Sequence, residues 1–141
     1  YRTYQKWNKV IEEIIEDNKE INIVLLGSSN ANYFAKKILD KLAHRNIYNC
    51  VNKYTFNQTA QIINKAQILL CCDGGLMHAA NSVDTPIVAL FAKLSPEMQL
   101  TETIKAFSVY DESDVNNIMV ENILKKYLEA SSLFCNRPQA E

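Results

Sequence analysis

Two patterns of apolar residues alternate along the chain. Over residues 4–17 the apolar positions recur at the spacing of one helix face, and the acidic residues fall elsewhere on the helical wheel. Residues 21–27 and 67–73 are instead short, nearly continuous apolar runs, as in strands that are covered on both faces. Each run ends in a glycine or an aspartate, and a segment with helical spacing follows. The pattern therefore predicts strands that alternate with helices.

The same reasoning extends the alternation to the rest of the chain. It predicts a weak strand at 47–52, a helix at 59–66, a strand at 87–91 that follows Pro86, a short strand at 107–110 and a closing helix after residue 114. Strands that alternate with helices imply right-handed crossovers. We therefore expect an α/β fold, a Rossmann-like parallel sheet with helices on both faces. One domain is expected over residues 1–130, with a C-terminal tail at 131–141.

Composition narrows the class of protein. The 141 residues are 48% hydrophobic and 22% charged, which is typical of a globular domain. The formal net charge of -1 gives no bulk attraction to nucleic acid, so no nucleic-acid partner is expected. Four cysteines include the adjacent pair Cys71 and Cys72, a spacing that suits neither a zinc knuckle nor a disulfide scaffold. They are predicted to be buried thiols in a reducing compartment. Because the chain starts at Tyr1, we expect it to be a piece of a longer protein.

The most informative candidate site is the exit of the strand at 67–73. Two glycines, Gly74 and Gly75, separate this strand from a helix, so backbone N–H groups at the helix N-terminus could meet a phosphate directly. Asp73 would repel phosphate but suits the hydroxyls of a sugar. Together they indicate a nucleotide sugar. The alternative is a plain tight turn capped by Asp73. His78, one turn into the helix, is better explained as a core or surface histidine than as a ligand-binding one.

Other strand exits give weaker signals. Ser28 and Ser29 could contact phosphate or ribose, but they also suit an ordinary loop that provides the N-cap of the next helix. Lys93 could reach phosphate or simply be solvated, and Tyr54 could form a wall for a base or belong to the core. The chain lacks the Gly-x-Gly-x-x-Gly fingerprint and the phosphate loop of P-loop enzymes. Its two histidines, His44 and His78, do not suggest a metal site.

The letters around these positions resemble a known family. Residues 66–80, with Asp73, Gly75 and His78, together with 85–91 and the Ser95-Pro96 pair, are similar to the donor-binding half of the heptosyltransferases. These glycosyltransferases move heptose from ADP-heptose onto the lipopolysaccharide inner core. The resemblance covers most of residues 1–129. It implies the C-terminal half of a GT-B fold, which consists of two Rossmann-like domains with the active site between them.

Roles for individual residues follow from the resemblance. Asp73 would bind heptose hydroxyls, Gly74 and Gly75 would offer amides to the diphosphate, and His78 would line or brace the pocket. Further donor contacts are implied for Tyr54 at the adenine and for Arg2 at a phosphate. Ser28, Ser29 and Lys93 are candidate donor contacts from their places at strand exits, not from the resemblance. The chain departs from the family pattern at Gly74, where the family has Thr or Ser, and at Ala92, where it has glycine. The family's ribose-contacting acid, expected near Asn30 or Ala31, also has no equivalent.

The resulting interpretation is an ADP-heptose-binding domain of a glycosyltransferase that acts in lipopolysaccharide core biosynthesis. The resemblance places the catalytic base, an acidic residue, on a missing N-terminal domain, which would also hold the lipopolysaccharide core acceptor. The chain alone is therefore expected to be inactive. No metal or cofactor is implied. The location would be cytoplasmic, with peripheral attachment to the cytoplasmic face of the inner membrane left open.

Two other interpretations stay open. The first is a degenerate nucleotide-binding or regulatory domain of the same fold, which Gly74 and the missing ribose acid would suit. The second is a small stand-alone α/β domain of the response-regulator kind. That class needs an acidic cluster at the tip of the first strand, where Gly27 and Ser28 stand instead.

Overall fold

The computed structural model describes residues 3–42, 46–93 and 106–134. Its contacts group the chain into two compact units, which are described separately. Unit 1 consists of the described residues of Tyr1–Tyr4 and Ala60–Glu141, and unit 2 is Gln5–Thr59. None of the described helices has the length and apolar character needed to cross a membrane.

Unit 2 is built on a pair of parallel strands. Its elements are α1 (Trp7–Asp17), β1 (Ile23–Leu25), the 3-10 helix η1 (Ser29–Ala31), α2 (Asn32–Lys41) and β2 (Ile47–Asn49). Ile23 pairs with Ile47 and Leu25 with Asn49. Helix α3 (Phe56–Lys65) begins in unit 2 and ends in unit 1.

The core of unit 2 lies between its strands and its first two helices. Ile11 of α1, Ile38 of α2 and Ile47 of β2 are buried together, and half-buried apolar side chains pack around them. Alternation along β1 places Ile23 and Leu25 on this side and Val24 on the other, where Val24 is 41% exposed. The prediction that this strand is covered on both faces is therefore wrong for Val24.

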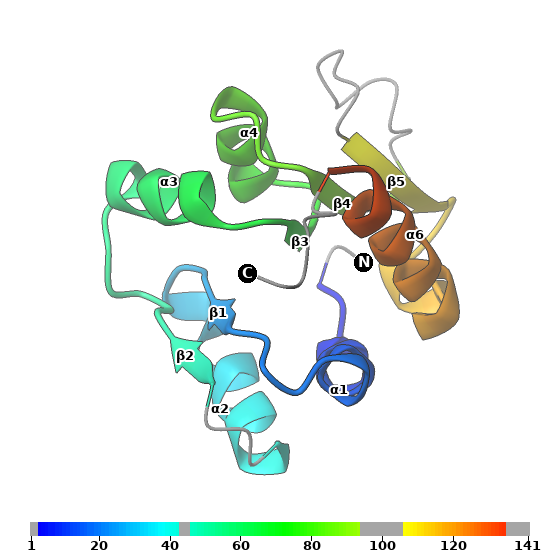
Figure 1. Ribbon diagram of the computed structural model, residues 1–141, viewed down its shortest axis with the longest axis horizontal. Coiled ribbons are helices and arrows are strands. Elements are labelled where there is room, and N and C mark those ends of the chain that lie inside the picture. The colour runs from blue at the N-terminus through cyan, green and yellow to red at the C-terminus, as the bar shows by residue number, and fades with distance from the viewer. Residues whose placement is uncertain (1–2, 43–45, 94–105, 135–141) are drawn as a thin grey trace. The chain divides into compact units, whose positions relative to one another are not determined.

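Unit 1 contains a three-stranded parallel sheet with the order β3-β4-β5 (Figure 1). Its elements are β3 (Leu69–Cys72), α4 (Gly75–Ser82), β4 (Ile87–Ala92), β5 (Ala106–Asp111), the 3-10 helix η2 (Val115–Asn117) and α6 (Val120–Phe134). Helix α4 packs on β3 and β4, and α6 packs on β4 and β5. All pairings among the described strands are parallel, so the predicted α/β fold with a parallel sheet is confirmed.

The central strand β4 is the most deeply buried element of unit 1. Every residue from Ile87 to Ala92 is buried, which explains why this segment reads as an unbroken apolar run. Thr85, just before the strand, is also buried, and its hydroxyl donates a hydrogen bond of 2.8 Å to the carbonyl oxygen of Ile63. The carbonyl oxygen of Pro86 accepts a hydrogen bond from the Leu69 N–H, so the sheet pairing starts one residue before β4.

The first described residues belong to unit 1. The buried Tyr4 donates a hydrogen bond of 3.0 Å from its hydroxyl to the carbonyl oxygen of Ile118. Asn116 donates from its side-chain amide to the carbonyl oxygen of Thr3 at 2.9 Å. This packing explains why the helix predicted from residue 4 begins only at Trp7, because Tyr4 is buried and bonded to Ile118 in unit 1.

The last helix is longer than expected. Helix α6 continues to Phe134, so residues 131–134 are helical and not part of a tail. Ala130 and Phe134 fall on the same face of the helix as the buried Ile123, and the Phe134 ring lies 6.0 Å from that of Phe107. This packing extends the helix beyond the predicted end. The rest of the predicted tail, 135–141, lies outside the described residues, and the prediction of one domain over 1–130 stays a prediction.

Candidate functional site

The strand β3 leads into α4 at the carboxyl edge of the parallel sheet of unit 1. The Asp73 N–H donates a hydrogen bond of 2.9 Å to the carbonyl oxygen of Leu90, so the sheet pairing continues one residue past Cys72. Gly74 is the N-cap of α4, and Gly75 is its first residue. Asp73 therefore stands at the sheet edge where ligands bind in parallel α/β folds, immediately before a helix N-terminus.

Neither glycine at this exit is required by the surrounding protein. A Cβ atom at Gly74 would have Cys72 O at 4.0 Å as its nearest neighbour, and one at Gly75 would meet nothing within 4 Å. Gly74 has extended backbone with φ 161°. The space beside both residues is open.

Helix α4 presents a favourable end to an anion. The first N–H groups of an α-helix have no partner within the helix, and they carry its partial positive charge. The first turn of α4 contains no acidic residue that would oppose an anion. His78 lies one turn into the helix with an exposed side chain, and its own N–H bonds back to the carbonyl oxygen of Gly74 at 3.4 Å. The exit thus combines the amides of a helix N-terminus with the Asp73 carboxylate just before them.

Lys93 follows β4 at the same edge of the sheet. Its side chain is exposed, and its backbone has φ 69°, the left-handed conformation that residues other than glycine seldom adopt. Ala92, where the family has glycine, is the buried last residue of β4, and the turn follows at Lys93.

The third exit of unit 1, after β5, is closed by its own side chains. The Asp111 carboxylate accepts hydrogen bonds from the N–H groups of Ser113 and Asp114 at 2.9 and 3.1 Å, and from the Asn117 side-chain amide at 3.2 Å. These bonds lower the pKa of Asp111 to about 2. The Asp114 side chain accepts from the Asn116 N–H and caps η2, the short helix that precedes α6.

In unit 2 the exits of β1 and β2 lie at one edge. The Asn52 N–H donates a hydrogen bond of 2.8 Å to the carbonyl oxygen of Gly27, so the pairing runs beyond both strands. Ser28 and Ser29 are exposed after β1, and Tyr54 is 49% exposed after β2. Of the two alternatives for Tyr54, this exposure is against the core and leaves the exposed ring.

The turn after β1 is tight. Gly27 has φ 154°, and a Cβ atom there would lie 2.8 Å from the Cβ of Ala31. The Ser28 hydroxyl donates a hydrogen bond of 2.6 Å to the side-chain oxygen of Asn30. Ser28 is the N-cap of η1 but makes no side-chain capping bond, and the N-cap of α2 is Ala31. The predicted capping of α2 by Ser28, Ser29 or Asn30 is therefore wrong, because a 3-10 turn intervenes.

The predicted site residues thus fall into two groups. Unit 1 brings together Asp73, Gly74, Gly75, His78 and Lys93 on its sheet edge and on α4, while unit 2 brings together Ser28, Ser29 and Tyr54. Arg2 lies outside the described residues.

The cysteines are not all buried as predicted. Cys71 is buried, and burial raises the pKa of its thiol. Cys72 is only half-buried because it points to the opposite face of β3 from Cys71. Cys50 is also half-buried. Cys135 lies outside the described residues. Within the described part of the chain, no group of three or more His, Cys, Asp or Glu side chains could hold a metal ion.

Comparison with known proteins decides the family. The model of glycosyltransferase family 9 (heptosyltransferase) matches residues 3–128. The chain belongs to glycosyltransferase family 9. A search of curated proteins found no match.

Solved structures support the fold of this family 9 chain. It is similar to a glycosyl transferase family 9 protein from Veillonella parvula with TM-score 0.79 and 16% identity, covering 89% of this chain and 40% of that one. It is also similar to ADP-heptose lps heptosyltransferase II of E. coli, with TM-score 0.77 and 21% identity over 92% of this chain and 41% of that one. The E. coli heptosyltransferase WaaC with ADP gives TM-score 0.76 and 16% identity over 92% and 39%. The chain thus spans about two fifths of the length of these structures and matches part of their GT-B fold.

One exposed feature of this family 9 chain was not assigned from the sequence. Tyr33 lies on the first turn of α2, 67% exposed, beside Phe34 and Lys37. The helical spacing contained a signal for it, because Tyr33 lies five residues before the buried Ile38 and so away from the apolar face. The sequence reasoning followed only the apolar face.

Proposed function

We propose that this chain is the nucleotide-sugar-binding domain of a heptosyltransferase that uses an ADP-heptose-like donor. The observation that supports it is the pair Gly74 and Gly75, which neither backbone conformation nor packing within the chain requires. Side chains at these positions would fill the space beside the first amides of α4. Glycine there is accounted for if a ligand approaches the backbone closely.

The exit of β3 suits the two parts of such a donor. The N-terminus of α4 binds the diphosphate through backbone N–H groups and the helix dipole. Asp73 repels the diphosphate and accepts hydrogen bonds from hydroxyls of the attached sugar. Lys93, at the neighbouring exit, contributes positive charge to the phosphate side, and His78 lines the same helix end.

The other residues that the sequence proposes as donor contacts are Ser28, Ser29, Tyr54 and Arg2, and they are proposed from the sequence without any distance to the exit of β3. Ser28 and Ser29 offer hydroxyls to phosphate or ribose, and Tyr54 offers an exposed ring to the base. Arg2 is proposed as a further phosphate contact from the family resemblance alone. The similar solved structure of WaaC with ADP supports an adenine nucleotide as part of the ligand.

In the proposed reaction the acceptor hydroxyl attacks the anomeric carbon of the donor sugar, and the bond to ADP breaks. The α4 amides and Lys93 stabilise the negative charge that develops on the leaving diphosphate. No metal or cofactor takes part in this scheme. The general base and the lipopolysaccharide acceptor site are assigned to a region outside this chain, which spans only about two fifths of its structural relatives.

This scheme predicts that the chain binds donor without turning it over, and that the reaction occurs at the cytoplasmic side of the inner membrane. Release of ADP from ADP-heptose by the isolated chain would overturn the proposed inactivity. It would not affect the proposed binding.

Titration calorimetry with ADP, UDP and NAD tests the binding site. We expect ADP to bind, and Asp73→Asn to weaken an ADP-sugar more than ADP, because the carboxylate contacts the sugar. Its matched control is Asp84→Asn, which removes one exposed carboxylate beyond the other end of α4.

A variant of Gly75 and a matched control test the approach of the ligand to the backbone. Gly75→Val should weaken ADP binding by about tenfold or more, since hydrogen bonds to a charged group are worth about 1.5–3 kcal/mol. Ser82→Val adds the same kind of side chain at the far end of α4 and should leave binding unchanged. Equal binding of ADP by Gly75→Val and the wild type would refute the site.

The second candidate function is a degenerate domain of the same fold, because Gly74 lacks the hydroxyl that the family has at this position. If the wild type binds none of the three nucleotides, this second candidate is favoured.

A further inference from the structure

The first two described residues are held by the segment that follows β5. The Tyr4 hydroxyl donates a hydrogen bond of 3.0 Å to the carbonyl oxygen of Ile118. The Asn116 side-chain amide donates one of 2.9 Å to the carbonyl oxygen of Thr3, and η2, which contains Asn116, contacts both β4 and β5. Because the strands of this sheet are parallel, the segment after β5 leaves at the same edge as Asp73. Thr3 and Tyr4 are therefore bound at the carboxyl edge of unit 1.

The register of the sheet brings this segment level with the end of β3. Cys72, the last residue of β3, pairs with Leu90, and Leu90 pairs with Val109 of β5. Strand β5 continues only as far as Asp111, and η2 follows after a short turn. The side-chain hydrogen bonds of Asp111 fix that turn, so the segment that holds Tyr4 is itself fixed.

The Tyr4 side chain reaches toward the end of β3. It is 2% exposed and belongs to unit 1, whereas the next residue belongs to unit 2. Burial raises the pKa of the Tyr4 hydroxyl, and the nearby Cys72 thiol raises it further. Cys72 is half-buried on the opposite face of β3 from Cys71, and it stands directly before Asp73. A buried phenol ring thus lies within electrostatic range of the residue that leads into the candidate site.

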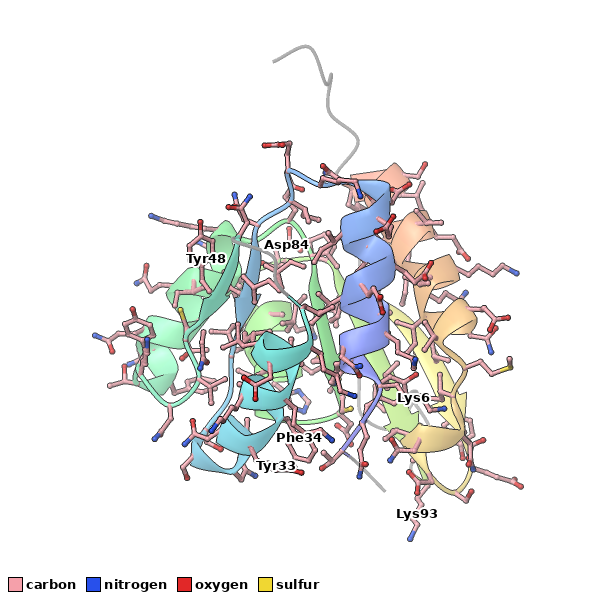
Figure 2. All side chains as sticks on the ribbon, turned by 90° about the horizontal axis from the view of Figure 1, so that it is seen from below. Lys6, Tyr33, Phe34, Tyr48, Asp84 and Lys93 are labelled. Carbon is pink, nitrogen blue, oxygen red and sulfur yellow. The ribbon has the colours of Figure 1, made fainter. Side chains whose placement is uncertain are left out.

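The exit of β3 has no comparable side chains of its own. Gly74 and Gly75 carry none, and the space beside them is open. At the neighbouring exit of β4, Lys93 points away from the protein (Figure 2). The backbone bond of 2.9 Å from the Asp73 N–H to the carbonyl oxygen of Leu90 continues the ladder by one residue. The direction of the Asp73 carboxylate therefore depends on how firmly the end of β3 is held.

We propose that Tyr4 positions Asp73 by holding the end of β3 in place through Cys72. The hydrogen bond to Ile118 fixes one end of the Tyr4 side chain, so its ring is a fixed support beside the strand end. Hydrogen bonds weaken steeply when their geometry is lost, so a small displacement of the Asp73 carboxylate weakens its bonds to sugar hydroxyls. The effect on the donor rests on the proposed function, whereas the effect on the strand end needs no ligand.

Amide hydrogen exchange on the ligand-free 141-residue chain tests the effect on the strand end. The same ladder provides a control, because the Leu69 N–H bonds to the carbonyl oxygen of Pro86 at the amino end of β3, also at 2.9 Å. In Tyr4→Leu the Asp73 N–H should exchange about tenfold faster or more, and the Leu69 N–H should change much less, because the opening is local. Equal acceleration of both amides would show a general loss of stability and would overturn the proposal.

Three further variants separate positioning from stability. Tyr4→Phe keeps the ring and should retain the slow exchange of the Asp73 N–H. Ile123→Val shortens a fully buried side chain of α6 and should not affect Asp73 more than Leu69. Asn116→Ala releases the carbonyl oxygen of Thr3 and should accelerate the Asp73 N–H by a smaller factor of about two to three. If Tyr4→Leu does not fold, an unchanged Asp73 N–H in Asn116→Ala overturns the proposal.

Cys72→Ala tests the route from Tyr4 to Asp73. Residues that act through one contact are not additive, so Tyr4→Leu should accelerate the Asp73 N–H less in the Cys72→Ala background than in the wild type. Full additivity of the two variants would show that Tyr4 does not act through Cys72, and the proposal would fail.

Calorimetry with ADP and ADP-heptose tests the effect on the donor, at a temperature where every variant is folded. Tyr4→Leu should weaken ADP-heptose by about three- to tenfold and ADP by less, because Asp73 contacts the sugar. Ile123→Val should change neither. An unchanged affinity for ADP-heptose in Tyr4→Leu would overturn the positioning of the donor contact. A wild type that binds neither nucleotide would refute the proposed function, and the exchange of the Asp73 N–H would still decide whether Tyr4 holds the end of β3.

Discussion

Glycine stands at the exit of β1 in unit 2 and at the exit of β3 in unit 1, but for different reasons. Gly27 has a left-handed φ of 154°, and a side chain there would collide with Ala31. Gly74 and Gly75 have neither constraint, and the space beside them is open. The first exit needs glycine to fold. The second has no such need, so its glycines are the ones that suggest a ligand.

Both exits look alike in the sequence, since each is an apolar run followed by glycine and a helix. The difference appears only when the backbone angle and the room for a Cβ atom are known. A glycine motif therefore indicates binding only where the fold itself could accept another residue. The following variants test this difference.

Gly27→Ala should have the largest effect on stability. The unfavourable φ costs about 1–3 kcal/mol and the forced contact with Ala31 about 1–3 kcal/mol more. We expect the free energy of unfolding, measured in urea by the fluorescence of Trp7 in unit 2, to fall by about 2–6 kcal/mol. The double variant Gly27→Ala with Ala31→Gly separates the two causes. It should recover the part due to the contact and keep the part due to φ, and a loss below 1 kcal/mol in Gly27→Ala would show that the turn relaxes.

Tyr4→Phe tests whether the first described residues stabilise unit 1. Removing the hydroxyl leaves the carbonyl oxygen of Ile118 without the Tyr4 hydrogen bond, at a cost of about 1–2 kcal/mol. The loss in the free energy of unfolding should appear in a urea titration that monitors the amide signals of β4. Tyr110→Phe, which removes the hydroxyl of an exposed tyrosine in the same unit, is the control. Equal stability of the two variants would mean that the Tyr4 hydrogen bond contributes nothing.

The exit of β5 provides a third case, in which a side chain closes the turn. The pKa of Asp111 in the folded chain is about 2, below its value of about 3.9 in unfolded chains. The stability that this carboxylate contributes is therefore present above about pH 4 and is lost as the pH falls toward 2. Asp111→Asn should flatten this part of the stability profile. Glu112→Gln, a charge change in the same turn, should not, and identical profiles for both variants would contradict the assignment.

These cases show what could be predicted from the sequence. The strands were recognised because buried parallel strands are continuous apolar runs, and β4 is buried at every residue. Tyr4 was assigned to a helix because spacing does not reveal a hydroxyl that bonds to a residue more than a hundred positions away. The predicted cap of α2 was misplaced because the 3-10 helix η1 lies between Ser28 and α2, which the residue pattern does not reveal.

The candidate site was predicted in the same uneven way. Asp73, Gly74, Gly75 and Lys93 could be predicted as neighbours because topology brings the carboxyl ends of parallel strands to one edge, and their role in binding stays a prediction. Whether glycine is needed at each position depends on backbone angles, which composition does not encode. Tyr33 was not assigned, although its place five residues before Ile38 already puts it away from the apolar face of α2.

Gly75→Ala should have the smallest effect on stability, and it separates the two exits most directly. A Cβ atom at this position meets nothing, and alanine is favoured over glycine in a helix by about 0.5–1 kcal/mol, so the variant should be as stable as the wild type or slightly more stable. If glycine is present for a ligand, the same variant should still weaken ADP in calorimetry, though less than valine does. Gain of stability together with loss of binding would be hard to explain by folding alone, because the only change is one methyl group beside the first amides of α4. Unchanged binding together with higher stability would instead mean that Gly75, unlike Gly27, is dispensable for both.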